Sequence, residues 1–208
     1  MAQNTSSAVM NQRKEPHSSL EHFPTPPWGT RALCELLEKA FNLSAMTVWE
    51  PACAEGHMAR PLAEYFGEVY ASDVHDYGFG SVDDFLFPGP PRFNPDWIIT
   101  NPPFRLAEQF VRRALPIASV GVAMLVRTNF CEGEGRYKRL FRTHPPQVEY
   151  VFTERLPMFK GRLVRDGSTA TAYSWLVWHN ERTSISFLTQ KRWIPPCRKR
   201  LEKDSDYD

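Results

Sequence analysis

Short apolar runs alternate with amphipathic stretches through the middle of the chain. Short, mostly apolar runs predict buried strands, whereas apolar residues that recur every three or four positions predict helices. The predicted strands are Met46–Trp49, Glu68–Ser72, Trp97–Thr100, Val120–Val126, Val148–Phe152 and Thr171–Trp178. The predicted helices are Thr30–Phe41, His57–Phe66 and Leu106–Leu115.

This order of elements predicts an α/β fold with a mostly parallel sheet, because a helix can return the chain between parallel strands. No good helix separates the last two strands, which predicts an antiparallel hairpin at one edge. One domain is expected over residues 21–194, between a disordered arm (1–20) and a polar tail (195–208). Trp175 and Trp178, three positions apart in one strand, should face opposite sides and serve packing.

Composition narrows the class of protein. The chain has 208 residues, of which 42% are apolar and 24% charged, as in a soluble domain with a full core. It contains no apolar run of about 18 residues and no apolar signal-peptide core near its start, so a cytoplasmic protein without membrane contact is expected. The four cysteines show no CxxC spacing and the histidines are scattered, so no metal is expected. Oligomeric state is left open.

Charge is distributed unevenly along the chain. Residues 1–104 carry 6 Lys and Arg against 13 Asp and Glu, and residues 105–208 carry 19 against 11. This split indicates that the second half faces a polyanion, although an unevenly charged, solvated surface explains it about as well.

Two stretches of the second half, 128–146 and 154–172, are basic and long enough to contact a nucleic acid. Arginine and lysine suit phosphate contacts, and arginine also reads guanine. The candidate nucleic-acid-binding residues are Arg136, Lys138, Arg139, Arg142, Arg155, Lys160, Arg162 and Arg165. Candidates for stacking or wedging when a base is flipped are Phe130, Tyr137, Met158 and Phe159.

Three motifs follow the first predicted strands. After the first comes Glu50-Pro51-Ala52-Cys53-Ala54-Glu55-Gly56, a turn of small residues that lets a ligand approach the backbone. Asp73 ends the second strand, where a carboxylate can accept hydrogen bonds from ribose hydroxyls. Asp84 and Phe85 follow further on, where they could contact an adenine ring. Taken singly, each motif also fits an ordinary turn.

The most informative motif is Thr100-Asn101-Pro102-Pro103-Phe104, at the end of a predicted strand. An exocyclic amine is a poor nucleophile because its lone pair is delocalised into the ring. Two acceptors on its two N–H bonds, the Asn101 side-chain oxygen and the Pro102 carbonyl, would localise that pair. Pro102 and Pro103 stiffen the turn, and Phe104 can stack on a planar base. The alternative is a plain proline turn.

Together, TPPWGTRALCELL, EPACAEG, ASDVHD, DDFLF and TNPPF, in this order, resemble the gamma-class adenine-N6 DNA methyltransferases and the small phage and prophage adenine methylases. The resemblance covers residues 23–130 well, and more loosely extends to Trp178. Ala54 stands where many relatives carry glycine, and no large target-recognition domain follows.

The resemblance assigns roles to individual residues. It implies S-adenosylmethionine as cofactor, with the TPP segment and the acidic-Pro-Ala-Cys turn on its methionine end, Asp73 on its ribose, and Asp84 with Phe85 on its adenine. The implied cofactor-binding residues are Thr25, Pro26, Pro27, Glu50, Pro51, Ala52, Cys53, Gly56, Asp73, Asp84 and Phe85. The implied catalytic residues are Asn101, Pro102, Pro103 and Phe104.

The expected fold is therefore the Rossmann-like fold of class I S-adenosylmethionine-dependent methyltransferases. The expected reaction is direct methyl transfer to adenine N6 in DNA, without a covalent enzyme intermediate. Cytosine C5 methylation is rejected, because its Pro-Cys nucleophile has no counterpart except Pro196-Cys197 in the tail. Methylation of adenine in RNA or of a protein glutamine remains open, as does a non-catalytic nucleic-acid-binding relative, since the motif selects a planar amine rather than a polymer.

Overall fold

The structure, a computed structural model, describes residues 21–179 and 188–207. Within them, eight strands form one sheet in the order β3-β2-β1-β4-β5-β7-β6-β8. The strands are β1 (Thr47–Glu50), β2 (Glu68–Asp73), β3 (Ser81–Val82), β4 (Trp97–Thr100), β5 (Gly121–Arg127), β6 (Val148–Phe152), β7 (Tyr173–His179) and β8 (Gln190–Ile194). The helices are α1 (Pro27–Leu37), α2 (Ala59–Leu62), α3 (Ala107–Ala114), α4 (Glu134–Arg136) and α5 (Arg198–Leu201).

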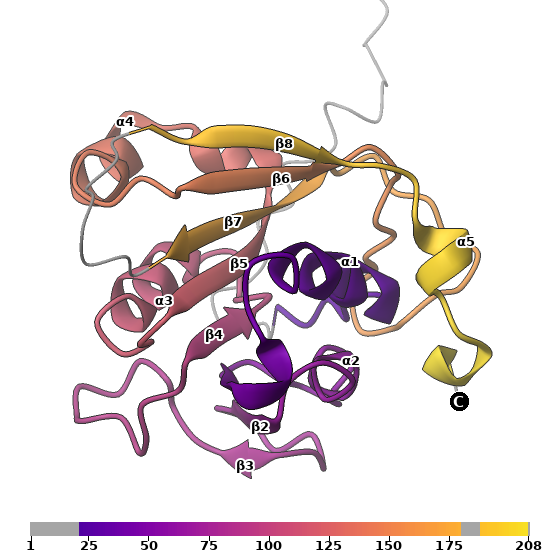
Figure 1. Ribbon diagram of the computed structural model, residues 1–208, viewed down its shortest axis with the longest axis horizontal. Helices are drawn as coiled ribbons and strands as arrows, with labels where there is room; N and C mark the ends of the chain where they lie inside the picture. Colours follow the sequence, from indigo (N-terminus) through magenta and orange to yellow (C-terminus); the bar gives the residue numbers. More distant parts are fainter. Residues whose placement is uncertain (1–20, 180–187, 208) are drawn as a thin grey trace, which may run out of the picture.

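The sheet is mostly parallel, with β7 as the exception. β7 runs antiparallel to both β5 and β6, whereas β3, β2, β1, β4 and β5 are parallel neighbours. Figure 1 shows β7 pointing opposite to β6 and β8. The parallel α/β sheet and the antiparallel hairpin predicted from the sequence are confirmed. β8 extends the sheet beyond the hairpin by pairing parallel with β6.

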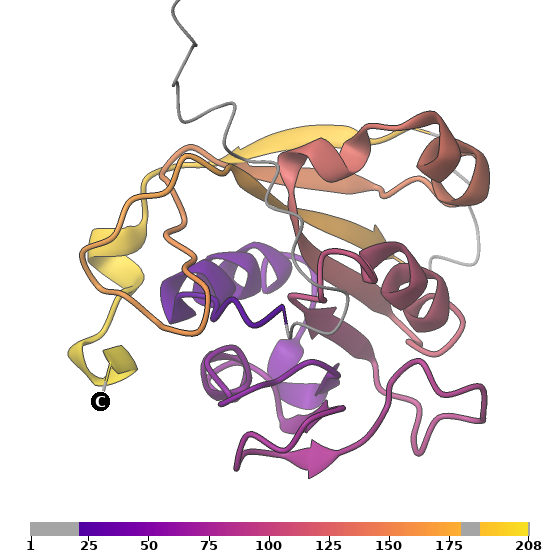
Figure 2. The same ribbon diagram turned by 180° about the vertical axis from the view of Figure 1, so that it is seen from behind.

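Helices cover both faces of the sheet. On one side of the sheet, α1 and α2 pack in a hydrophobic core through residues such as Leu33 and Leu62. On the other side, α3 packs in a second core through Val111. Accordingly, α1 lies in front of the sheet in Figure 1, and α3 lies in front in Figure 2. Trp175 and Trp178 are buried in opposite cores, as their spacing predicts.

Element boundaries differ from prediction at several places. Helix α1 begins at Pro27, three residues before the predicted start, because proline is tolerated at the first helical position and presets its φ angle. Helix α2 is limited to Ala59–Leu62, and turns fill the rest of the predicted helix over 57–66. Strands β3 and β8 were not predicted. The predicted arm, residues 1–20, lies outside the described residues.

Residues 195–207 form α5 and a 3-10 turn (Asp204–Tyr207) that pack on α1. Cys197 and Leu201 of this segment are buried. The guanidinium of Arg31 in α1, only 3% exposed, donates to both carboxylate oxygens of Asp206 and to those of Glu64. The predicted polar tail thus contributes a buried ion pair to the core, in addition to its exposed charges.

Candidate active site

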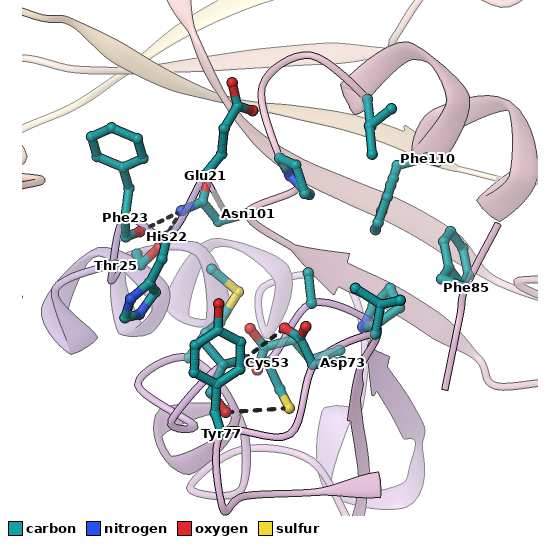
Figure 3. A pocket seen from close by; sticks show the side chains of 18 of the residues that line it. Glu21, His22, Phe23, Thr25, Cys53, Asp73, Tyr77, Phe85, Asn101 and Phe110 are labelled. Atoms are coloured by element: carbon teal, nitrogen blue, oxygen red, sulfur yellow. Dashed lines mark hydrogen bonds between the residues drawn. The ribbon is translucent and has the colours of Figure 1, made fainter. Parts of the chain in front are cut away.

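A cavity of about 330 Å³ opens where β1, β2 and β4 end. The carboxyl ends of neighbouring parallel strands meet at one edge of a sheet, which is where α/β proteins bind ligands. In Figure 3, Phe85 and Phe110 lie at one end of the cavity, and His22 and Tyr77 lie at the other. The cavity is therefore bounded by aromatic rings at both ends.

The turn after β1 is held against the end of β2. Asp73 accepts hydrogen bonds from the backbone N–H of Ala54 (3.0 Å) and of His75 (3.1 Å). Ala54 has a φ of 42°, in the left-handed region that disfavours side chains. Glycine, expected here from the resemblance, would relieve that strain. Each oxygen of Asp73 already accepts one bond and retains a lone pair for a ligand hydroxyl.

Glu50, at the end of β1, is 2% exposed and lines the cavity. Burial, followed by the nearby charge of Asp73, raises the pKa of this carboxyl well above its ordinary value. Its Oε2 atom is buried and has no hydrogen-bond partner in the described part of the chain. A buried acid with an unpartnered oxygen suits a cationic ligand group, which would favour the charged carboxylate.

Asn101, directly after β4, has its side-chain orientation fixed by hydrogen bonds. Its Nδ2 donates to the backbone carbonyl of Phe23 (2.9 Å) and to Thr25 Oγ1 (3.1 Å), as Figure 3 shows. The Thr25 hydroxyl in turn donates a hydrogen bond to Met158 Sδ (3.9 Å). The amide nitrogen is thus committed to the protein. Asn101 Oδ1 is buried without a partner among the described residues, which leaves it able to accept from a ligand amine.

Residues 21–25 form a strap across this site. Glu21 pairs with Arg105, with 3.0 Å between Oε1 and Nε, and His22 Nε2 lies 2.7 Å from an oxygen of Glu55. The His22 carbonyl also accepts from the backbone N–H of Gly161, in the loop between β6 and β7. The strap is therefore held by contacts with three separate segments of the chain.

Phe104 lies beside the cavity, outside its lining. Its ring centroid is 5.3 Å from that of Phe23 and 6.1 Å from that of Tyr173. The Arg127 guanidinium sits 4.2 Å from the Phe104 centroid, at cation–π distance. A base that stacks on Phe104 must therefore share the ring with these neighbours or displace one of them.

Most of the cofactor-binding candidates lie around one cavity. Those that line it are Thr25, Glu50, Pro51, Ala52, Cys53, Asp73, Asp84 and Phe85. Pro26, Pro27 and Gly56 do not: Pro27 starts α1, and Gly56 (φ 84°) packs against the ring of Phe79, where a Cβ would approach to 2.6 Å. Burial raises the pKa of the Cys53 thiol to about 12, so it stays protonated. Of the tetrad, Asn101 and Pro103 line the cavity, while Pro102 is buried nearby.

Sequence reasoning did not assign several cavity residues to the site: Glu21, His22, Phe23, Pro24, His57, Met58, Val74, Tyr77, Leu86, Leu106 and Phe110. The only available signal was their closeness in sequence to TPP, EPACAEG, ASD, DDF and NPPF. His57 has a pKa below its ordinary value because it is partly buried, so neutral pH leaves it uncharged.

The structure separates the two basic stretches. In Figures 1 and 2, α4 lies at one side of the molecule, whereas the 153–172 loop lies at the other, beside α5. Three of the candidate nucleic-acid-binding residues are ion-paired within the protein: Lys138 with Glu134, Arg139 with Glu108, and Arg165 with Asp204. Arg142, Lys160 and Arg162 are exposed. The charge of these stretches is thus partly neutralised and does not form one surface.

No helix in the described residues, 21–179 and 188–207, is long and apolar enough to cross a membrane. No group of three or more His, Cys, Asp or Glu side chains in these ranges is arranged to hold a metal ion.

No protein-family model matches the sequence, and the search of curated proteins found no match. Solved structures do match. The chain resembles a protein assigned as the modification subunit of a type I restriction enzyme from Vibrio vulnificus (TM-score 0.60, 14% identity, 97% of this chain and 53% of that one). This chain therefore spans about half the length of that subunit.

Two other structures are similar over most of their length. One is a protein assigned as an RNA methyltransferase from Pyrococcus horikoshii (TM-score 0.59, 15% identity, 82% of this chain and 95% of that one). The other is the precorrin-6y C5,15-methyltransferase from Geobacter metallireducens (TM-score 0.50, 12% identity, 71% and 86%). At such identities the match concerns the fold, which is the Rossmann-like fold of class I S-adenosylmethionine-dependent methyltransferases, as predicted.

Proposed function

We propose that this protein transfers a methyl group from S-adenosylmethionine to the exocyclic N6 amine of adenine in DNA. The observation that carries the proposal concerns the side-chain oxygen of Asn101, Oδ1. This oxygen is a buried acceptor without a hydrogen-bond partner among the residues that the structure describes, and its residue lines the cavity. The amide nitrogen beside it donates to Phe23 and Thr25. A pre-placed acceptor of this kind stabilises charge that develops on an attacking amine.

The proposed chemistry uses two acceptors of the tetrad. Asn101 Oδ1 accepts one N–H of the amine and the Pro102 carbonyl accepts the other, which localises the nitrogen lone pair. Because the amide and the proline turn are already rigid, little reorganisation accompanies the reaction. Neither acceptor forms a covalent bond to the substrate.

The cavity fits the cofactor in size and in chemistry. Its volume of about 330 Å³ falls within the usual range for small-molecule sites, about 300–1,000 Å³. Glu50 offers a buried acid to a cationic group, Asp73 offers acceptors to hydroxyls, and Phe85 with Phe110 offers an apolar wall. When bound, S-adenosylmethionine supplies a methyl group activated by a positively charged sulfur.

The case for DNA rests on the basic second half and on the resemblance to adenine DNA methylases. Arg127 and Arg136 line a pocket beside Phe104 of the tetrad and add positive charge where a polynucleotide would approach. The substrate test includes both DNA and RNA.

The test is methyl transfer with isotopically labelled S-adenosylmethionine and, separately, DNA, RNA and a protein mixture. Nuclease digestion and mass spectrometry then identify the product nucleoside. Labelled N6-methyl-deoxyadenosine from DNA supports the proposal. Label in RNA or in glutamine would reassign the substrate, methylcytosine would overturn the choice of base, and no cofactor binding by calorimetry would overturn the enzyme assignment.

A further inference from the structure

A second pocket, of about 270 Å³, lies beside the catalytic tetrad. Phe104, the last residue of the tetrad, forms part of its lining, and Glu21 lines both this pocket and the cofactor cavity. The remaining lining comes from the end of β5, the turn that follows it, α4 and the start of α3: Arg105, Ala107, Val126, Arg127, Asn129, Phe130 and Arg136. Sequence analysis assigned no role to Arg105 or Arg127.

The pocket is positively charged. Three arginines and one glutamate line it, which gives a formal charge of +2. Glu21 is paired with Arg105, because one of its carboxylate oxygens contacts the Arg105 side chain and the other accepts from the Arg105 backbone N–H. The positive charge of Arg127 and Arg136 therefore has no acidic partner in the pocket lining.

Both of these arginines are held in place and retain unused donors. Arg127 lies over the Phe104 ring, and Arg136 lies 4.1 Å from the Phe130 ring centroid. Arg136 Nη1 donates to the backbone carbonyls of Phe130 (2.6 Å) and Glu132 (2.8 Å). The Nε atoms of Arg127 and Arg136 are buried without a hydrogen-bond partner in the described ranges. Buried donors of this kind are normally satisfied.

We infer that this pocket binds a backbone phosphate of the polynucleotide substrate, next to the nucleotide whose base enters the site. The inference rests on the proposed function. Guanidinium groups match phosphate in charge and in geometry, and the pocket places two of them beside Phe104. Its role is to fix the strand while Asn101 engages the base.

A methylphosphonate scan tests the inference. Short DNA duplexes carry one uncharged methylphosphonate at each position around the target adenine, and fluorescence anisotropy measures their affinity. In the wild-type protein, one or two adjacent positions should weaken binding about tenfold or more, as expected for loss of a charge-assisted hydrogen bond. In Arg136→Gln, the penalty at those positions should shrink, and the slope of log affinity against log salt should fall by about 0.9.

Arg112→Gln is the matched control, because Arg112 is exposed on α3 and does not line the pocket. It should leave the pattern of the scan unchanged. Should Arg136→Gln fail to fold, as judged by circular dichroism, Arg127→Gln replaces it, because Arg127 is the other pocket arginine with an unused donor.

If each methylphosphonate weakens binding by the same factor in Arg136→Gln as in the wild type, the phosphate subsite is overturned. The proposed function still stands in that case, provided the wild-type protein binds and methylates the duplex. If free inorganic phosphate displaces the labelled duplex as effectively as unlabelled DNA does, the pocket is a site for small anions, and this result would also overturn the inference. If the wild-type protein binds no polynucleotide even at low salt, the proposed function itself fails.

Discussion

Replacing Asn101 by alanine removes the Oδ1 atom, which has no partner among the described residues, and the hydrogen bonds that Nδ2 donates to Phe23, Thr25 and Met158. Loss of one pre-placed polar group that acts on a developing charge lowers turnover about 10²–10³-fold. A hundredfold loss corresponds to about 2.7 kcal/mol of transition-state stabilisation. The lost contacts to Phe23 and Thr25 should also lower the free energy of unfolding by about 1 kcal/mol each.

Thr25→Val separates these two effects. It leaves Asn101 Oδ1 in place but removes the hydroxyl that accepts from Nδ2 at 3.1 Å. The amide nitrogen then keeps its bond to the Phe23 carbonyl and its contact with Met158 Sδ (3.8 Å). Turnover should drop about tenfold, the equivalent of one neutral hydrogen bond of roughly 1–1.5 kcal/mol. Turnover is measured in a single-turnover assay with labelled cofactor, and calorimetry measures the affinity for cofactor.

Turnover by Asn101→Ala should therefore be slower than turnover by Thr25→Val, and Asn101→Ala should bind cofactor close to normally. Full activity of Asn101→Ala would refute the reasoning, because no other residue is assigned the role of Oδ1. Equal losses in both variants would mean that Asn101 acts by holding the strap.

Three further predictions concern the cofactor cavity and the fold. Asp73→Ala should weaken S-adenosylmethionine binding by about 1.5–3 kcal/mol in calorimetry, and unchanged affinity would remove Asp73 from the site. Because burial raises the pKa of Glu50, the protein without cofactor should lose stability as pH rises from 4.5 through the raised pKa, since the folded state holds the proton more tightly. Binding of the cationic cofactor should then release that proton, so affinity should rise with pH in the wild type but not in Glu50→Gln. Arg31→Ala should lower the free energy of unfolding in urea by about 3–5 kcal/mol, because it leaves the buried Asp206 carboxylate uncompensated. The double variant with Asp206→Ala should cost less than the two single changes summed, and additive losses would contradict the buried pair.

The central part of the fold could be predicted because its strands are apolar on both faces. Gly121–Arg127 is buried along nearly its whole length, and so is Trp97–Thr100, which leaves a continuous apolar signal. Gln190–Ile194 has four exposed residues out of five, as an edge strand can, and carries no such signal. Ser81–Val82 is too short to produce a pattern.

The sequence predicted the site residues that lie at strand ends, because the topology of a parallel sheet brings those ends together. Apart from Thr25, the prediction did not include the strap, and it named Met158 only as a candidate for stacking on a base. Nothing local indicates that Phe23 and Met158 contact Asn101, 78 and 57 residues away. The prediction also could not tell paired from unpaired charges. Arg139 counts as a basic residue in the sequence, but Glu108, 31 positions away, takes its guanidinium in the structure.

The Arg31–Asp206 pair has a consequence for the order of folding. These residues are 175 positions apart, so their contact closes nearly the whole described chain. During synthesis from the N-terminus, α1 is made early, whereas Asp206 emerges after every strand of the sheet. Contacts of such long range form late because the loop they close must first be ordered. Until Asp206 has been synthesised, α1 therefore carries a guanidinium without this carboxylate, and the pair forms only after the strands of the described sheet have been made.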